Sequence, residues 1–347
     1  MKNKNERGFF DEQFRLERLA SKEDPLTKLD KVIRWEDFRF IIENAFPKTD
    51  PKLGGRPAFD RVMMFKVLVL QSLYNISDAN TEFQILDRLT FMRFLGLNLS
   101  DRVPDEKTIW LFREQLKEHK IFDDLFDFFR NKIQVAGLFV EKGQIVDANI
   151  IEVPRQRNTR EENQQIKEGE VPEQWKDDEN KLRQKDMDAD WLKKNGKNYY
   201  GYKNHIKVDQ GSKLIQEYQV TPASVHDSDV LEDLLQKKDE SQNLHADSAY
   251  SGDRCKSLLR KFKMKDKVHE KGYRNNPLTK KQMASNRKKS TVRARVEHVF
   301  GFMHMNMNHR IGLRYIGMDR IASAIGLKNI VYNMCRVMYL VQGERCV

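Results

Sequence analysis

The sequence predicts an α/β protein, with an all-helical N-terminal domain followed by a domain built on a mixed β-sheet flanked by helices. Three observations indicate this class. Apolar residues recur at helical spacing through residues 1–136, the pattern changes to β-rich runs from Gly143, and those runs alternate with amphipathic helices. We therefore expect two domains, residues 1–136 and 140–342, which is the number that a chain of 347 residues favours.

The N-terminal domain is predicted as a block of helices. Residues 59–74 are strongly apolar, so this helix should be buried. Further helices are expected as two short ones within 79–96, one opened by Pro104 and Asp105, and one over 121–135. Such a block suits DNA binding, dimer formation or a purely structural bundle, and no helix-turn-helix spacing decides among them.

The second domain alternates strands and helices. Strands are predicted at 143–153, 199–209, 214–223, 244–250 and 267–270, and helices at 227–237, 251–262, 291–309 and 318–341. This order of elements is that of an RNase H-like domain, a mixed sheet with helices on its faces. Residues 155–198 are hydrophilic and of mixed charge, which predicts a solvated insertion after the first strand.

Charge and cysteine content narrow the class of partner. Lys and Arg number 63 against 52 Asp and Glu, and the net charge of +11 favours a polyanion such as nucleic acid. The three cysteines form no zinc or disulfide pattern, and no apolar run predicts a signal peptide or a membrane span. We expect a protein of the reducing cytoplasm that is associated with the nucleoid and not with a membrane.

Three acidic residues stand out by position. Asp147 lies in the middle of the first strand, Asp247 ends the fourth strand, and Glu297 lies on the penultimate helix. A lone carboxylate in an apolar strand is costly to bury unless it is paired or binds a metal. In an RNase H-like order the first and fourth strands are neighbours, so all three carboxylates should meet at one edge. Each has a structural alternative, either a hydrogen-bonded aspartate or, for Glu297, a salt bridge to Arg293.

Three converging carboxylates suit a divalent-metal site for phosphodiester chemistry. Two Mg²⁺ ions about 3.5–4 Å apart activate a nucleophile and stabilise the leaving oxygen. Mg²⁺ takes oxygen ligands, whereas zinc favours His or Cys. We therefore expect Asp147, Asp247 and Glu297 to be both the catalytic residues and the ligands of two Mg²⁺ ions per site, with Mn²⁺ as an alternative.

Around these acids the sequence resembles the DDE-type transposases of bacterial insertion sequences. The motifs that carry the resemblance are VDANIIE around Asp147, YYGYKNHIKVD, VHDSD, HADSAYSGD around Asp247 and RARVEHVFG around Glu297. The helical block from Arg56 to Leu116 also resembles the N-terminal domain of that family. The resemblance implies that Asp147, Asp247 and Glu297 are the DDE triad.

The resemblance also implies the activity and the partners. Such enzymes bind the terminal inverted repeats of their own element, nick the DNA with metal-activated water, and join the freed 3′-hydroxyl to target DNA. Two ends must be brought together, which implies a homodimer in the DNA complex. The chain departs from the family signature at Ser290 and His304, where the family has Tyr and Lys, so what those two positions do for DNA is not carried over.

Basic residues provide the candidate DNA contacts. Residues 271–295 contain nine Lys or Arg and no acid, which predicts a basic loop that leads into the Glu297 helix and contacts phosphate; a solvated loop is the alternative. Lys203, His205 and Lys207 alternate on one strand, and we expect the lysines to touch phosphate near the metals, with a structural hydrogen bond as the alternative for His205. The predicted DNA-binding residues are Lys203, Lys207, Arg274, Lys280, Lys281, Arg287, Lys288, Lys289, Arg293 and Arg295.

The sequence leaves two other functions open. A basic DNA-binding regulator with an inactive acidic cluster would bind DNA without cleaving it. An RNase H-like nuclease would cleave DNA without strand transfer. Incubation of labelled inverted-repeat ends with Mg²⁺ or Mn²⁺ separates both hypotheses from a transposase.

Overall fold

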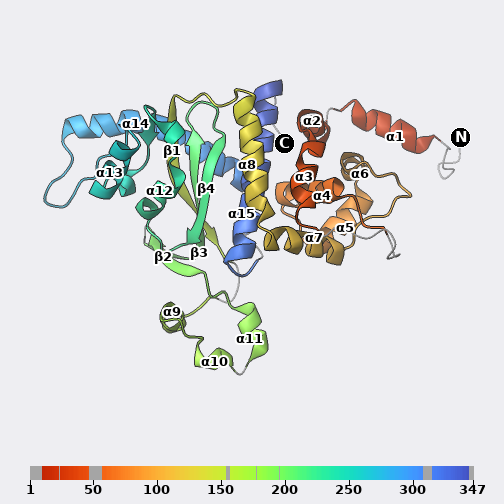
Figure 1. The fold of residues 1–347 in the computed structure, drawn as a ribbon, viewed down its shortest axis with the longest axis horizontal. Helices are drawn as coiled ribbons and strands as arrows, with labels where there is room; N and C mark the ends of the chain where they lie inside the picture. The colour runs from red at the N-terminus through yellow and green to blue at the C-terminus, as the bar shows by residue number, and fades with distance from the viewer. Residues whose placement is uncertain are drawn as a thin grey trace, which may run out of the picture. The chain divides into compact units, whose positions relative to one another are not determined.

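The structure of the chain is a computed structural model, shown in Figure 1. It describes residues 10–22, 24–46, 57–153, 157–176, 178–194, 196–307 and 315–343. The chain divides into two compact units, one made of Met1–Leu125 with Met334–Val347 and the other of Phe126–Asn333.

The first unit is helical, as the sequence predicts. Its elements are α1 (Asp11–Ala20), α2 (Pro25–Val32), the 3-10 helix η1 (Trp35–Phe38), α3 (Arg39–Glu43), α4 (Arg61–Tyr74), α5 (Asp78–Asp87), α6 (Leu89–Leu95) and α7 (Glu106–Glu118). Asp60 begins α4 by accepting a hydrogen bond from the backbone N–H of Met63 at 2.9 Å. Phe65 and Leu68 of this helix are fully buried, which confirms the prediction of a buried helix here.

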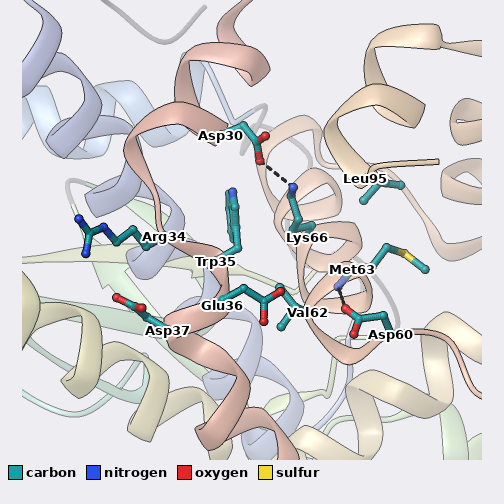
Figure 2. A pocket seen from close by; sticks show the side chains of 10 residues that line it. All are labelled: Asp30, Arg34, Trp35, Glu36, Asp37, Asp60, Val62, Met63, Lys66 and Leu95. Carbon is teal, nitrogen blue, oxygen red and sulfur yellow. Dashed lines mark hydrogen bonds and ion pairs between the residues drawn. The ribbon is translucent and has the colours of Figure 1, made fainter. Parts of the chain in front are cut away.

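A cavity of about 540 Å³ opens in this first unit beside η1 and α4 (Figure 2). Figure 2 shows Lys66 directed toward Asp30, and the ammonium lies 2.6 Å from the carboxylate. Four of the ten lining residues are acidic and two are basic. An excess of carboxylates repels phosphate, so this cavity is poorly suited to the backbone of a nucleic acid.

The second unit contains the sheet. Its elements are most of α8 (Ile121–Val135), then β1 (Gly143–Glu152), α9 (Arg160–Lys167), α10 (Glu173–Lys176), α11 (Glu179–Gln184), β2 (Asp190–Lys194), β3 (Lys197–Asp209), β4 (Ile215–Pro222), η3 (Asp227–Val230), α12 (Leu231–Leu234), η4 (Lys237–Asp239), β5 (Asn243–His245), η5 (Ser248–Tyr250), α13 (Asp253–Lys261), β6 (Lys265–Asp266), α14 (Lys280–Met305) and the first part of α15 (Met318–Gln342).

The sheet is mixed, with the strand order β2-β3-β1-β5-β6, and β4 also pairs with β3. Strand β1 runs antiparallel to β3 and parallel to β5, so it lies between them as an RNase H-like order requires. Strands β2 and β4 pair with successive halves of β3. Strand β2 is a difference from the prediction, because it lies within the predicted insertion, where mixed charge hides a short edge strand.

The register of β1 against β3 decides which side chains share a face of the sheet. Asp147 pairs with Ile206, so both side chains lie on one face. Helices α14 and α15 pack on that face, whereas Val146 faces the opposite side and packs in an apolar core with Leu231 of α12 and Leu258 of α13. Figure 1 shows α12 and α13 on one side of the strands and α15 on the other.

The predicted hydrophilic insertion has a small core of its own. Trp175 is fully buried and donates its indole N–H to Glu162 at 2.8 Å, and Lys185 pairs with the same carboxylate at 3.0 Å. Asp186 accepts a hydrogen bond from the hydroxyl of Tyr202 at 2.7 Å, which ties the insertion to β3. Most described residues of this insertion are exposed, as predicted for a solvated segment, and one buried tryptophan with a polar network orders the described part of it.

Helix α14 begins eleven residues earlier than the predicted start at 291, at Lys280. Thr279 and Gln282 form a capping box, in which each side chain bonds to the backbone of the other residue. Most of the basic stretch is consequently helical, and the prediction of a basic loop is wrong for residues 280–290, which lie before the predicted helix start. The sequence T-K-K-Q carries this start signal, which a search for apolar periodicity overlooks.

The C-terminal helix α15 agrees with the prediction for 318–341. Its apolar surface is interrupted by buried polar residues, among them Asn329, which bonds to Asn204, and Asn333, which donates to the carbonyl of Ile215 at 2.8 Å. Across the described residues, no helix has the length and hydropathy needed to cross a membrane.

Candidate active site

Asp147, the predicted acid of β1, is half-buried. Its side chain is 16% exposed, and its carboxylate accepts a hydrogen bond from the backbone N–H of Ala148 at 2.9 Å. Burial, together with the negative charge of Asp247, raises the pKa of Asp147 to about 6, against the opposing effects of the Ala148 hydrogen bond and of Arg293. The fold thus places Asp147 where ionisation of its carboxylate costs free energy.

Asp247 lies at the same edge of the sheet because β5 is parallel to β1. Ile145 pairs with His245, so the same register continued by two residues sets Asp247 beside Asp147. The carboxylate of Asp247 begins η5 by accepting a hydrogen bond from the backbone N–H of Ala249 at 2.7 Å, which fixes its position.

Glu297 lies on α14 and is connected to Asp147 through the side chain of Arg293. The guanidinium of Arg293 lies between two carboxylates, with Nη1 2.7 Å from Oδ2 of Asp147 and Nη2 3.0 Å from Oε1 of Glu297. The salt bridge of Glu297 to Arg293, which the i, i+4 spacing predicts, is therefore formed, and Arg293 also bonds to the buried acid of β1. Glu297 itself is 59% exposed.

The three acids converge without forming a closed cage of ligands. Arg293 joins Asp147 to Glu297, and the charge of Asp247 acts on Asp147, but no contact links Asp247 to Glu297 among the hydrogen bonds and ion pairs of the described residues. Within the part of the chain that the structure describes, no three His, Cys, Asp or Glu side chains are grouped closely enough to hold a metal ion.

A divalent cation nevertheless fits these residues by charge and by donor type. Two carboxylates, those of Asp147 and Glu297, share one guanidinium, and the negative charge of Asp247 also acts on Asp147, so negative charge is in excess. Carboxylate oxygens are the ligands that Mg²⁺ and Mn²⁺ prefer. Asp147, Asp247 and Glu297 therefore supply the donor type that a divalent metal takes.

Two further side chains near the aspartates escape prediction from the sequence. Tyr250 is buried, and its pKa is raised by burial and by the charges of Asp227, Asp147 and Asp247, which places its hydroxyl among these acids. His269 follows β6, and its pKa is lowered by burial and by the positive charges of Arg293 and Lys289. Because β6 is parallel to β5, residues that follow it reach the same edge of the sheet.

Ser290, one of the two positions that depart from the family signature, contacts His269. The hydroxyl of Ser290 lies 3.3 Å from Nε2 of His269. A serine is short enough to leave room for the imidazole, and its side chain points inward and not toward solvent.

The basic residues of α14 fall on two faces of the helix. Lys289 donates to the carbonyl of Val268 at 2.7 Å, and Arg293 bridges the acids, so these two face the sheet and are half-buried. Arg295 is exposed, although it donates to the carbonyl of Gln210 at 2.8 Å. The exposed predicted DNA-binding residues are Arg274, Lys280, Lys281, Arg287, Lys288 and Arg295.

Lys203 and Lys207 are not placed to touch phosphate, which corrects the prediction. The register sets them opposite Ile150 and Val146, on the face of the sheet that Asp147 does not share. Both lysines are buried and each is paired with an acid. The ammonium of Lys203 bonds to Asp227 at 2.8 Å, and that of Lys207 lies 2.6 Å from Asp239.

His205, which lies between these lysines on β3, makes a structural hydrogen bond, the alternative expected for it in place of a phosphate contact. Its Nε2 lies 2.9 Å from the hydroxyl of Thr221, and the ring is fully buried. Burial lowers the pKa of His205 to about 4. An interior histidine of this kind holds the two strands together and does not reach DNA.

The fold and the acidic edge define an enzyme class, metal-dependent enzymes that process phosphodiester bonds on an RNase H-like sheet. The family model described as Transposase DDE domain matches residues 139–334, more than half of the chain, and the model described as Transposase domain (DUF772) matches residues 14–115. The protein belongs to the DDE transposase family.

The chain is also similar to a solved structure from a transposase. That structure is a cryo-EM structure of the piggyBac transposase synaptic complex with hairpin DNA, with 11% sequence identity and a TM-score of 0.43. The similarity covers 93% of this chain and 77% of that chain.

Membership of the family confirms the predicted class of enzyme. The protein is a DNA transposase, an enzyme whose partner is DNA and whose chemistry depends on a divalent metal. The RNase H-like fold expected from the order of strands and helices is confirmed with it.

Replacement of Asp147 tests how much its ionised carboxylate lowers the free energy of unfolding. The folded pKa, about 6, lies above the ordinary value of 3.8, so at pH 8 the ionised carboxylate destabilises the metal-free fold. Asp147→Asn should raise the free energy of unfolding at pH 8 by about 1–3 kcal/mol. The gain should shrink as the pH falls from 6 to 4, because the folded protein then takes up the proton. Thermal or denaturant unfolding at both pH values measures this.

The matched control for this measurement is Asp253→Asn, which removes a fully exposed acid paired with Lys256. It should leave the free energy of unfolding unchanged within about 0.5 kcal/mol at both pH values. A loss of stability in Asp147→Asn at pH 8 would contradict the argument, since it would show that the carboxylate is a net stabilising group.

Proposed function

We propose that Asp147, Asp247 and Glu297 form the catalytic triad of this transposase and bind two Mg²⁺ ions, for which Mn²⁺ can substitute. The observation that carries the proposal is the convergence of the three acids on one edge of the sheet. Asp147 and Asp247 come from neighbouring parallel strands, and Glu297 is joined to Asp147 through Arg293.

The metal ions and the three acids have different roles at this edge of the sheet. When bound, the metal ions would activate the attacking oxygen and stabilise the leaving oxygen of an in-line displacement. Asp147 and Asp247 are held by backbone hydrogen bonds, so they position charge rigidly. Glu297 lies on an exposed part of α14, where its side chain can adjust as DNA enters. Both nicking and strand transfer are displacements at phosphorus, so one site serves both steps.

The partner is proposed to be the terminal inverted repeats of the protein's own element, a bacterial insertion sequence, together with target DNA in the cytoplasm. The outward face of α14 and the segment before it supply exposed cations for phosphate contact. Lys281, Lys288 and Arg295 recur at intervals of seven residues, so they form one stripe along the helix. We further propose a homodimer in the DNA complex, because two ends must be held together for joining.

Neutral replacements of the triad test the catalytic assignment. Asp147→Asn, Asp247→Asn and Glu297→Gln should each lower nicking and joining by about a hundredfold or more, because each removes a charge from the metal site. DNA binding, measured in the same buffer by gel shift, should stay within a few-fold of wild type. The substrate is a labelled duplex carrying the terminal repeats that flank the coding sequence.

A matched control keeps this test specific. Glu152→Gln removes an acid from the same strand as Asp147, at an exposed position paired with Arg157, and should leave cleavage unchanged. If the triad variants cut and join ends as well as Glu152→Gln does, these acids are not the catalytic residues. Loss of DNA binding in all three would instead indicate a structural role.

Salt dependence tests the proposed DNA face of α14. Replacing Lys280, Lys281, Arg287 and Lys288 by Gln should weaken binding and reduce the slope of log K against log salt by about 0.9 for each phosphate that the variant no longer neutralises. Lys261→Gln with Lys263→Gln removes exposed lysines that pair with Glu232 and Glu240 on another element and should leave the slope unchanged. Equal slopes in both variants would exclude this face as the phosphate-binding surface.

A further inference from the structure

Arg293 holds a position that a DNA-contacting arginine would not be expected to hold. Its two terminal nitrogens bond to carboxylates from elements far apart in the chain, Asp147 on β1 and Glu297 on α14. Its third donor, Nε, is buried without a hydrogen-bond partner among the described residues. The guanidinium is therefore directed at the acids by two charge-assisted bonds.

The electrostatics of the edge explain why a cation belongs there. Asp147 and Glu297 hold one guanidinium between their carboxylates, which would otherwise repel each other, and the negative charge of Asp247 acts on Asp147. One guanidinium neutralises a third of the charge of these three acids. Divalent cations neutralise more and bind carboxylate oxygens directly, so they compete for the same oxygens that Arg293 holds.

The side chain of Arg293 has access to solvent, into which it moves when it is displaced. Its side chain is 24% exposed, and it lies on the helix that carries the outward cations Lys288 and Arg295. A guanidinium is never deprotonated in a protein, so after release it remains charged and suited to a phosphate oxygen. A phosphate that attracts Arg293 would thus make Asp147 and Glu297 available to metal.

We propose that Arg293 is the internal counter-ion of the metal-free site, that it competes with divalent metal for Asp147 and Glu297, and that its release couples metal binding to DNA binding. This inference rests on the proposed function, since it takes these carboxylates to be the metal ligands. By linkage, whatever draws Arg293 away from the acids raises the affinity for metal, and bound metal leaves Arg293 free for phosphate.

The test is a titration of DNA-free, full-length protein with Mn²⁺, in which free Mn²⁺ is followed by electron paramagnetic resonance. Arg293→Gln removes the competing charge and keeps a polar side chain. It should bind Mn²⁺ about tenfold more tightly than wild type or better, because the metal no longer has to displace a cation.

Arg295→Gln is the matched control. It removes the same charge from the same helix two residues away, but its guanidinium bonds to the carbonyl of Gln210 and not to a carboxylate. Its affinity for Mn²⁺ should stay within about twofold of wild type. Asp147→Asn added to Arg293→Gln should abolish the tightened binding, which shows that the ion measured is the one at this site.

The outcomes separate this inference from the proposed function. Equal or weaker Mn²⁺ binding by Arg293→Gln, at a site that Asp147→Asn removes, overturns the competition and leaves the metal site in place. Absence of Mn²⁺ binding by both wild type and Arg293→Gln overturns the metal site itself, and the competition with it.

A second measurement covers the case in which Arg293→Gln fails to fold. Wild-type protein labelled with ¹⁵N-arginine is titrated with Mg²⁺, and the side-chain resonances of Arg293 are assigned by their loss in Arg293→Lys. Release predicts that these signals change from a restrained to a freely rotating guanidinium as Mg²⁺ binds. Signals that stay unchanged at saturating Mg²⁺ overturn the proposal.

Discussion

The buried negative charge of Asp147 sets the electrostatics of the catalytic unit. Its strand lies between two others, burial opposes ionisation of its carboxylate, and Asp247 adds a second negative charge beside it. A buried charge that loses its partner destabilises a fold by about 3–5 kcal/mol, so the surroundings must supply positive charge. Arg293 supplies part of it, and in the proposed function a divalent cation supplies the remainder. The position proposed for catalysis is thus one that costs stability.

The two faces of the sheet differ in how interior charge is neutralised. On the opposite face, Lys207 and Asp239 neutralise each other with neither side chain exposed. On the face that Asp147 shares, the compensating cation is a long, half-exposed side chain from α14. Such a cation can be exchanged, which a fully buried pair cannot easily be. The same helix carries exposed lysines and arginines on its outer surface, so one element connects the acidic edge to the proposed DNA surface.

The sequence was sufficient for the fold, because the order of strands and helices places β1 between β3 and β5. The assignment of Asp147, Asp247 and Glu297 as catalytic residues stays a prediction, drawn from acids that interrupt an apolar pattern or follow a strand. The sequence was insufficient for Lys203 and Lys207, since alternating charge marks a solvent face only when one face of a strand is exposed. Both faces of β3 are covered, and the partner of Lys207, Asp239, lies 32 residues away, beyond any local pattern. The start of α14 was readable from the capping box of Thr279 and Gln282.

The proposed site requires three carboxylates from distant parts of the chain to meet at divalent metal. A crystal structure of the protein grown with Mn²⁺, with the ion located by its anomalous scattering, is the decisive experiment. We expect an anomalous peak about 2.0–2.4 Å from carboxylate oxygens of Asp147, Asp247 and Glu297, with the guanidinium of Arg293 moved away from the acids. A peak bound elsewhere, at saturating Mn²⁺, with Arg293 still between Asp147 and Glu297, would contradict it.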